Sequence, residues 1–256
     1  MPKMPVLFVG HGSPMNAILD NNYSRNWKMI ADRIPRPKAI LSISAHWYTR
    51  GTYIMSNTNP KTIYDMYGFP PALYDITYEV PGAPEIASLS HSMISGKTDF
   101  DDSWGIDHGS WSVLVHMYPN RDIPVFQISI DSEAPPETHY RIGRELSALR
   151  DQGVLIMGSG NIVHNLRQVD WHKPGEGLDW AYEFDDFINE NILSGNHDRI
   201  LNYKDMGMIA RMAVPTPDHF FPLLYVLGAS NQNDEISVYN KSGELGSLTM
   251  TSYLFE

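Results

Sequence analysis

The stretch Val6-Leu7-Phe8-Val9-Gly10-His11-Gly12-Ser13-Pro14 decides how the fold of this chain is interpreted. Its first four residues are apolar, two of them β-branched, and they run directly into a Gly-His-Gly-Ser-Pro turn. An apolar run bounded by turn residues predicts a buried strand. His11 then stands where the strand ends, and this is the edge at which ligands bind in α/β sheets.

A second junction of the same kind follows along the chain. Residues 39–45 form another apolar run, and it ends in His46. Between the two runs, residues 22–34 carry apolar side chains at helical spacing, which predicts a β-α-β unit. If the two strands are neighbours in one sheet, His11 and His46 lie side by side.

The rest of the chain continues this alternation. We predict one domain over residues 1–256 with an α/β fold, in which helices flank a central mixed, largely parallel sheet. Thr216 as N-cap and Pro217 as first helical residue predict a helix start that places His219 in its first turn. Further strands are predicted at residues 52–56, 123–130, 153–157, 236–239 and 247–254, and helices at 84–94, 112–117, 136–150, 180–193 and 216–227.

The composition excludes several classes of partner and site. The net charge of -11 argues against nucleic acid or an anionic membrane as the main partner, because both require a basic face. With no cysteine, disulfides, thiolate metal sites and cysteine nucleophiles are impossible. There is no signal-like segment and no run of about 18 apolar residues, so we expect a cytoplasmic protein.

Five histidines stand at the ends of predicted elements: His11, His46, His108, His164 and His219. Any one of them alone could be a hydrogen-bonded core histidine. Their repetition favours a metal site, because three or four neutral imidazoles can surround Zn(II) or Fe(II) at about 2 Å. We predict one metal ion held mainly by His11, His46 and His219, with His164 as a fourth ligand or as a base.

Three other features have competing interpretations. Ser13 lacks the G-x-S-x-G context of a nucleophile, and a turn-stabilising hydroxyl is the favoured interpretation. Residues 158–161 (GSGN) resemble an anion-binding turn but lack the spacing and lysine of a phosphate loop, so we expect their glycines to allow a tight turn toward His164. Residues 57–82 form either a wall or lid over a binding site, or a surface loop packed by its own rings.

The motifs together resemble those of the DOPA 4,5-dioxygenase type of class III extradiol ring-cleavage dioxygenases. The match runs in order along almost the whole chain. It is carried by the stretches at residues 10–16 (GHGSPMN), 44–47 (SAHW), 104–111 (WGIDHGSW), 160–166 (GNIVHNL) and 215–219 (PTPDH).

The resemblance implies a chemistry and a set of roles. A metal, usually Fe(II), binds a catechol and O2, and the ring is cut next to the diol. His11 and His46 match metal ligands, and His164 matches either a ligand or the base that takes a catechol proton. His108 matches a pocket histidine that contacts substrate or oxygen, and Asp107 is expected to be structural.

This chain departs from the wider class in one position. Much of the class completes the metal site with a glutamate, whereas His219 occupies the matching place here. An all-imidazole set suits Zn(II) well, although only iron supplies the redox change that O2 chemistry needs. The expected cofactor is therefore one divalent ion, Zn(II) or Fe(II).

The leading hypothesis is a dioxygenase that opens a catechol such as DOPA with O2, by 4,5-cleavage to a seco product. Trp47 and the aromatic residues of the 57–82 segment, Tyr67 among them, would supply ring-stacking surface. A zinc-dependent hydrolase is the first alternative, with His164 as base beside a metal-bound water. A non-catalytic protein that binds a metal or an aromatic ligand is the second.

Overall fold

A six-stranded sheet forms the centre of the computed structural model, which describes residues 3–256. In spatial order its strands are β6 (Val125–Gln127), β2 (Ala39–Ser44), β8 (Val154–Gly160), β1 (Val6–Gly10), β12 (Ser252–Phe255) and β9 (Ile236–Tyr239). The strands from β6 to β1 are parallel, and β12 and β9 continue the sheet in antiparallel pairs. The predicted α/β fold with a mixed, largely parallel sheet is confirmed.

The strands that end in His11 and His46 are not neighbours. β8 lies between them and pairs with both, Gly160 opposite Gly10 and Ser159 opposite Ser44. The condition of adjacent strands, under which the sequence placed His11 beside His46, is therefore not met. Because all three strands are parallel, their carboxyl ends still meet at one edge of the sheet.

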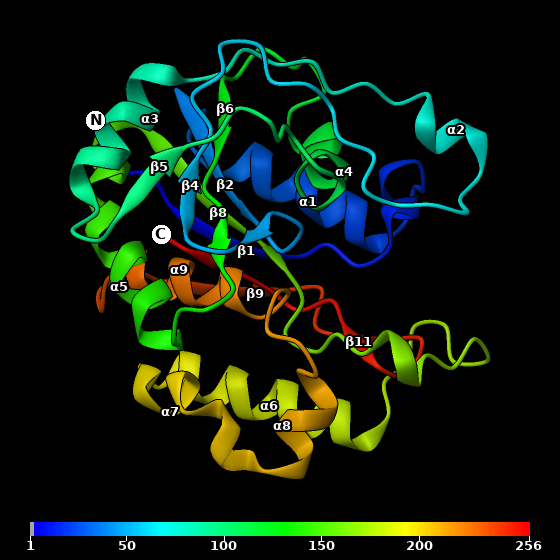
Figure 1. The fold of residues 1–256 in the computed structure, drawn as a ribbon. Coiled ribbons are helices and arrows are strands. Elements are labelled where there is room, and N and C mark those ends of the chain that lie inside the picture. Colours follow the sequence, from blue (N-terminus) through cyan, green and yellow to red (C-terminus); the bar gives the residue numbers. More distant parts are fainter. Residues whose placement is uncertain (1–2) are drawn as a thin grey trace.

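Helices cover both faces of the sheet (Figure 1). On one face, α1 (Asn22–Arg33) packs against α4 (His108–Met117), and α4 contacts β2 and β8. On the other face, α5 (Pro136–Leu146) packs on α9 (Phe221–Ala229), which is buried along its whole length against β8 and β1. Beyond α9, at the bottom of Figure 1, lie α6 (Asp179–Leu193), α7 (His197–Leu201) and α8 (Met208–Ala213).

Short elements complete the chain at the rim of the sheet. Three two-stranded pairs, two small helices and four 3-10 turns make up this set. They are β3 (Tyr48–Thr49) with β7 (Ile130–Asp131), β4 (Thr52–Ile54) with β5 (Thr98–Phe100), β10 (Gly243–Glu244) with β11 (Leu248–Thr249), α2 (Pro71–Tyr74), α3 (Pro84–Met93), η1 (Pro14–Ala17), η2 (Ser147–Gln152), η3 (Leu166–Gln168) and η4 (Tyr203–Met206).

One continuous hydrophobic core fills the space between the sheet and both helical layers. Its largest enclosed side chains include Trp27 of α1, Trp111 of α4 and Tyr225 of α9. Among residues 3–256, no helix has both the length and the apolar character needed to cross a bilayer.

Two predicted strands are each divided in the structure. The 123–130 run forms β6 and β7, because Ser129 leaves the sheet and donates its backbone N–H to Tyr53 instead. The 247–254 run divides at Met250, where β11 pairs with β10 and β12 pairs with β1. Apolar and polar side chains continue to alternate through both divisions, so periodicity alone does not reveal them.

Strand β8 is longer than predicted, and its glycines do not form the expected tight turn. The strand continues through Gly158 and Gly160. A Cβ on Gly158 would lie 2.5 Å from the carbonyl oxygen of Pro222, and one on Gly160 would lie 2.1 Å from that of His219. These glycines instead allow α9 and the turn before it to pack directly on the sheet.

Two helix starts also differ from the prediction. Helix α4 begins at His108 instead of Ser112, because the Asp107 side chain accepts a hydrogen bond from the Ser110 backbone and caps it. Helix α9 begins at Phe221, since Phe220 and Phe221 both donate to the Pro217 carbonyl and close a separate turn. His219 therefore lies in the turn that precedes α9.

Candidate active site

The five histidines singled out in the sequence lie together at the carboxyl edge of the sheet. His11 follows β1, His46 follows β2 and His164 follows β8, while His108 opens α4 and His219 precedes α9. The ring centroids of His11 and His46 are 5.1 Å apart, those of His46 and His108 3.9 Å, and those of His164 and His219 3.5 Å. Five distant segments thus deliver imidazoles to one place.

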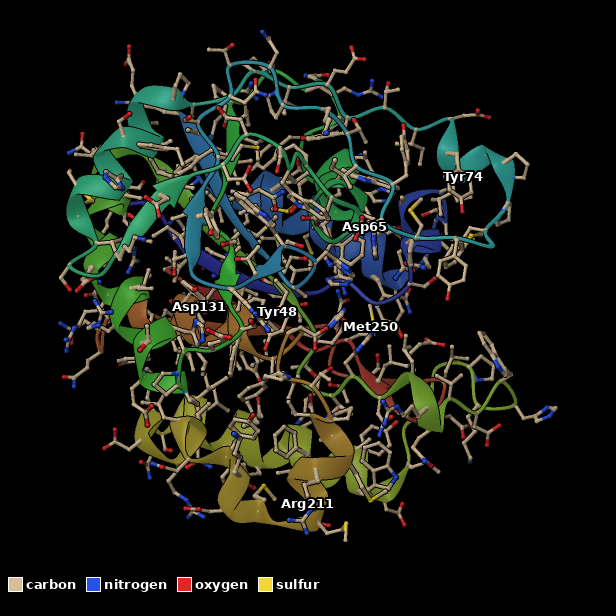
Figure 2. All side chains as sticks on the ribbon, in the orientation of Figure 1. Tyr48, Asp65, Tyr74, Asp131, Arg211 and Met250 are labelled. Carbon is tan, nitrogen blue, oxygen red and sulfur yellow. The ribbon has the colours of Figure 1, made fainter. Side chains whose placement is uncertain are left out.

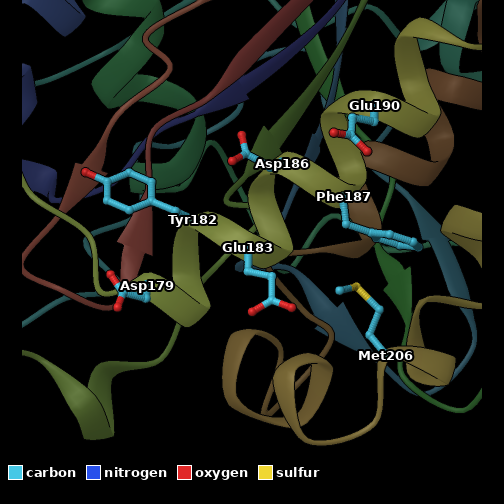
Figure 3. Close-up of a pocket in the computed structure, with 7 residues that line it drawn as sticks. All are labelled: Asp179, Tyr182, Glu183, Asp186, Phe187, Glu190 and Met206. Atoms are coloured by element: carbon cyan, nitrogen blue, oxygen red, sulfur yellow. The ribbon is translucent and has the colours of Figure 1, made fainter.

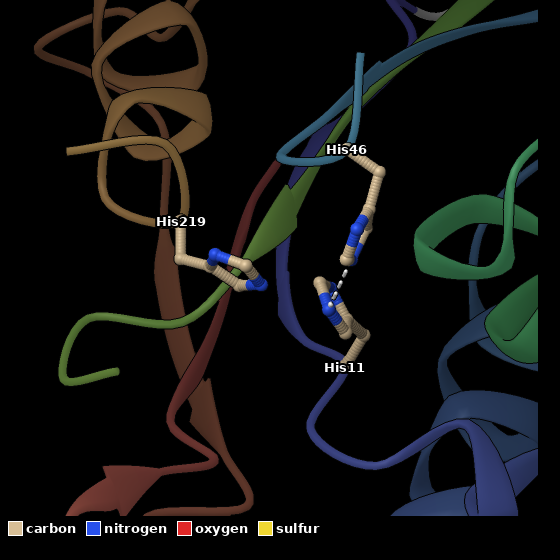
Figure 4. Close-up of side chains that lie close together, drawn as sticks. All are labelled: His11, His46 and His219. Carbon is tan, nitrogen blue, oxygen red and sulfur yellow. Dashed lines mark hydrogen bonds between the residues drawn. The ribbon is translucent and has the colours of Figure 1, made fainter. Parts of the chain in front are cut away.

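Three of these rings present nitrogen atoms to a common space (Figure 4). The Nε2 atoms of His11 and His46 lie 3.2 Å apart, and a nitrogen of His219 lies within 4.8 Å of a nitrogen on each of them. On each ring the Nδ1 atom already faces an oxygen. The partners are Ser159 Oγ at 3.1 Å from His11, Asp65 Oδ2 at 3.0 Å from His46 and Asp218 Oδ2 at 2.8 Å from His219.

This arrangement fits a divalent transition-metal ion. Metal-binding histidines usually direct the nitrogen that is not coordinated to a carboxylate or another oxygen, which fixes the tautomer and the ring orientation. Here each Nδ1 has such a partner, so each Nε2 is free to bind. Three imidazole nitrogens leave further coordination positions for exogenous ligands.

The electrostatics keep most of these rings neutral. Burial, followed by the neighbouring histidines, lowers the pKa of His11 and of His219 well below the usual value. Burial also lowers the pKa of His46, but the carboxylates of Asp65, Asp107 and Asp218 outweigh it, and the net shift is upward. Neutral imidazole is the form that binds a metal.

His164 differs from the three convergent rings. It stacks on His219 with an angle of only 5° between the ring planes, so it meets that ring face to face. Burial lowers the pKa of His164 to about 4, which leaves the ring neutral, with one unprotonated nitrogen, at neutral pH.

His108 faces a carboxylate that the sequence interpretation missed. Asp65 Oδ1 accepts a hydrogen bond from the His108 backbone N–H at 3.0 Å and lies 3.0 Å from His108 Nδ1. Burial, with the charge of His46 as a further cause, lowers the pKa of His108. In the sequence, Asp65 is one of three acids in the aromatic-rich 57–82 segment, and no local pattern distinguishes it from Asp75 and Glu79.

The two aromatic residues predicted to stack on a substrate occupy different environments. Trp47 is 3% exposed and belongs to the hydrophobic core, whereas Tyr67 is 92% exposed. Among the described residues, the ring contacts of the histidine cluster include neither of them. Their contact with a substrate stays a prediction.

The rest of the 57–82 loop is partly packed by its own rings. The Tyr64 ring contacts those of Tyr74 and Trp111 at 6.1 and 6.0 Å, and its hydroxyl donates to the Ile76 carbonyl. This agrees with the interpretation of an ordered loop, while Asp65 brings the same loop to the histidines.

Two other side chains have the structural roles expected of them. The Ser13 hydroxyl accepts a hydrogen bond from the Met15 backbone and caps η1. Asp107 is fully buried and, besides capping α4, accepts hydrogen bonds from Ser44 Oγ at 2.6 Å and Trp104 Nε1 at 3.0 Å.

A cavity of about 520 Å³ lies away from the histidines, along the outer side of α6 (Figure 3). Its walls combine four carboxylates with apolar side chains and contain no histidine. The lining residues are Asp179, Tyr182, Glu183, Asp186, Phe187, Glu190 and Met206.

Comparison with known proteins agrees with the geometry of the histidine cluster. Residues 2–255 match the family described as the catalytic LigB subunit of aromatic ring-opening dioxygenase. The 4,5-DOPA dioxygenase extradiol of Escherichia coli K12 is 45% identical over 98% of this chain and 94% of its own length. The Beta vulgaris protein of the same name is 35% identical over 97% of this chain and 95% of its own length.

A solved structure extends the similarity to three dimensions. The crystal structure of an uncharacterized protein from Escherichia coli K12 is similar with a TM-score of 0.87 and 40% identity, covering 99% of this chain and 100% of that one. These relationships favour the enzyme hypothesis over a hydrolase or a non-catalytic binding protein. The chain belongs to the family of the catalytic LigB subunit of aromatic ring-opening dioxygenases and is an extradiol ring-cleavage enzyme.

Proposed function

We propose that this protein uses one divalent metal ion to open the ring of a catechol such as DOPA with O2, by 4,5-cleavage to a seco product. The observation that carries the proposal is the convergence of three imidazoles, from His11, His46 and His219, beside two further histidines. The names of the Escherichia coli and Beta vulgaris relatives support the substrate class.

In this proposal His11, His46 and His219 hold the metal, which when bound supplies a common site for the catechol oxygens and O2. Fe(II) is the expected ion, because Zn(II) has no accessible redox change. The same three imidazoles also suit Zn(II), so a zinc-loaded form is expected to bind substrate without opening the ring.

The two remaining histidines act on protons and orientation. His164 is neutral and half-buried, and in this proposal its unprotonated nitrogen accepts a proton from a catechol hydroxyl. His108 opens a helix next to His46 and can hydrogen-bond a substrate or oxygen atom from the other side of the cluster. The two thus have separate tasks.

The test is anaerobic loading of the purified protein with Fe(II), followed by a panel of catechols and then air. The wild-type protein should consume O2 and form a yellow ring-opened product. His11→Ala and His219→Ala should lose both the bound metal and the activity, whereas His172→Ala, which removes an exposed histidine, should retain both.

His164→Ala should bind metal but lose most of its turnover, by about 10²–10⁴-fold, which is the usual contribution of a general base. Absence of O2 uptake across the whole panel would remove the proposal. Hydrolytic activity of the Zn(II) form without oxygen would support the alternative of a zinc hydrolase.

A further inference from the structure

Asp65 is the acidic group closest to two of the site histidines, and it comes from the aromatic-rich loop of residues 57–82. Its Oδ2 lies 3.0 Å from His46 Nδ1, and its Oδ1 lies 3.0 Å from His108 Nδ1. The carboxylate is only 13% exposed. Figure 2 shows Asp65 on the inner part of the loop, with Tyr74 at its outer end.

The backbone explains why Asp65 reaches this position. Thr62 forms a parallel bridge with Ile106, and Ile63 N–H donates to the Ile106 carbonyl at 2.8 Å. Asp65 follows Ile63 by two residues, and His108 follows Ile106 by two residues, so Asp65 lies opposite His108. The His108 backbone N–H, which has no partner within its own helix, donates to Asp65 Oδ1.

The Asp65 carboxylate and the His108 ring have few other polar groups with which they could form hydrogen bonds. Among residues 3–256, neither Asp65 Oδ2 nor His108 Nδ1 makes an aligned hydrogen bond, and the 3.0 Å contacts with His46 Nδ1 and with Asp65 Oδ1 are the close polar contacts that they have. Leaving such buried groups unpaired costs about 1–3 kcal/mol each, and more for a charged group. The carboxylate and the two ring N–H groups are therefore the available partners for one another.

We propose that Asp65 is a positioning residue, which holds both His46 and His108 in the tautomer with the proton on Nδ1. His46 then presents Nε2 to the metal, and His108 presents an unprotonated Nε2 to the substrate. The loop that carries Asp65 is thereby part of the metal centre. This inference rests on the proposed function, because it assigns a task to the loop at the same site.

The inference makes metal affinity depend on a residue that does not touch the metal. Loss of an outer carboxylate partner of a metal-binding histidine typically lowers metal affinity 10–100-fold. Asp65→Asn removes the charge but keeps an oxygen that accepts the His108 backbone hydrogen bond. Asp75→Asn removes a carboxylate from the exposed outer part of the same loop and is the matched control.

The experiment measures Zn(II) affinity of the full-length protein by competition with a chromogenic chelator, with no need for turnover. Asp65→Asn should bind Zn(II) 10–100-fold more weakly than wild type, Asp75→Asn should match wild type, and Asp65→Glu should recover part of the loss. Urea unfolding of the metal-free variants checks that the fold is retained. Asp65→Glu is an independent variant with the charge preserved.

The outcomes separate this inference from the proposed function. Equal Zn(II) affinity of Asp65→Asn and wild type would overturn the positioning role alone. So would two zinc ions per wild-type chain with one lost in Asp65→Asn, because Asp65 would then be a ligand. A wild-type protein that binds no metal would instead overturn the proposed function.

Discussion

Asp185 shows how a single buried group sets a pH dependence that is unrelated to catalysis. It lies on the inner side of α6, where Thr251 Oγ1 donates to its Oδ2 at 2.9 Å and its Oδ1 has no partner among the described residues. Burial, only partly offset by Thr249, Thr251 and Lys241, raises the pKa of Asp185 to about 6. The folded state therefore favours the protonated carboxyl.

The sign of the effect follows from linkage. A carboxyl whose pKa is raised on folding contributes stability below its unfolded pKa, and this contribution is lost as pH rises through about 6. At pH 7.5 the ionised group costs about 2–3 kcal/mol, at 1.36 kcal/mol per unit of pKa. Asp185→Asn should therefore raise the free energy of unfolding by about that amount at pH 7.5, and by under about 1 kcal/mol at pH 4.

Urea unfolding of the metal-free protein at both pH values measures this difference. Asp186→Asn is the control, since Asp186 is 55% exposed, pairs with Lys241 and should change stability by at most about 1 kcal/mol. A destabilised Asp185→Asn protein at pH 7.5 would contradict the argument.

Among single residues, the site histidines could be predicted from the sequence, whereas the carboxylates that contact them could not. His11, His46 and His164 could be found because each follows an apolar strand. Asp65 could not, since its role depends on a bridge between residues 62 and 106 that no local pattern encodes. Asp218 stood in a quoted motif, but its contact with the neighbouring ring became visible only in three dimensions.

At the scale of elements, the amino terminus of α4 combines helix capping with a buried polar network. Asp107 caps the helix and also accepts hydrogen bonds from Ser44, Trp104 and Gln127, the last at 3.2 Å. Asp107→Ala should lower the free energy of unfolding by about 2–4 kcal/mol, because a lost cap is joined by unpaired buried donors.

Asn21→Ala is a useful comparison, because Asn21 caps α1 near the surface without such a network. It should cost about 1 kcal/mol, the usual value for a helix cap. Equal losses for the two variants, measured by urea unfolding, would show that the network around Asp107 adds nothing.

Element boundaries were less predictable than the elements themselves. The sequence patterns identified α1, β2 and α3 to within one residue, whereas the helix predicted over 136–150 ends at Leu146 and continues as the 3-10 turn η2. The patterns failed where the chain changes partners, as at Ser129 and Met250, and where Thr216 offered a cap that the 217–220 turn does not use. These boundaries depend on contacts with segments that are distant in sequence, and local sequence patterns carry no information about those contacts.

At the scale of the whole molecule, Arg150 joins parts that are far apart in sequence. It is 1% exposed, and its guanidinium donates to the carbonyls of Met4 and Ala229 and to the Asp234 carboxylate at 2.7 Å. This one side chain connects the start of β1, the end of α9 and the approach to β9.

Arg150→Ala should lower the free energy of unfolding by about 3–5 kcal/mol, because it leaves a mostly buried carboxylate without its partner. Arg25→Ala breaks the exposed pair with Asp20 and should leave the free energy of unfolding almost unchanged, because solvent screens such a pair. Both variants are measured by urea unfolding at neutral pH. A loss near 1 kcal/mol for Arg150→Ala would contradict the proposed connection.

The insertion of β8 between β1 and β2 has a consequence for the order of events during synthesis. A nascent chain that has left the ribosome with β1 and β2 complete still lacks the strand that joins them, more than a hundred residues downstream. His219 lies further downstream and is synthesised later still. If the proposed ligands are right, capture of the ion must follow tertiary assembly, and fragments that end before that turn would contain only part of the proposed ligand set.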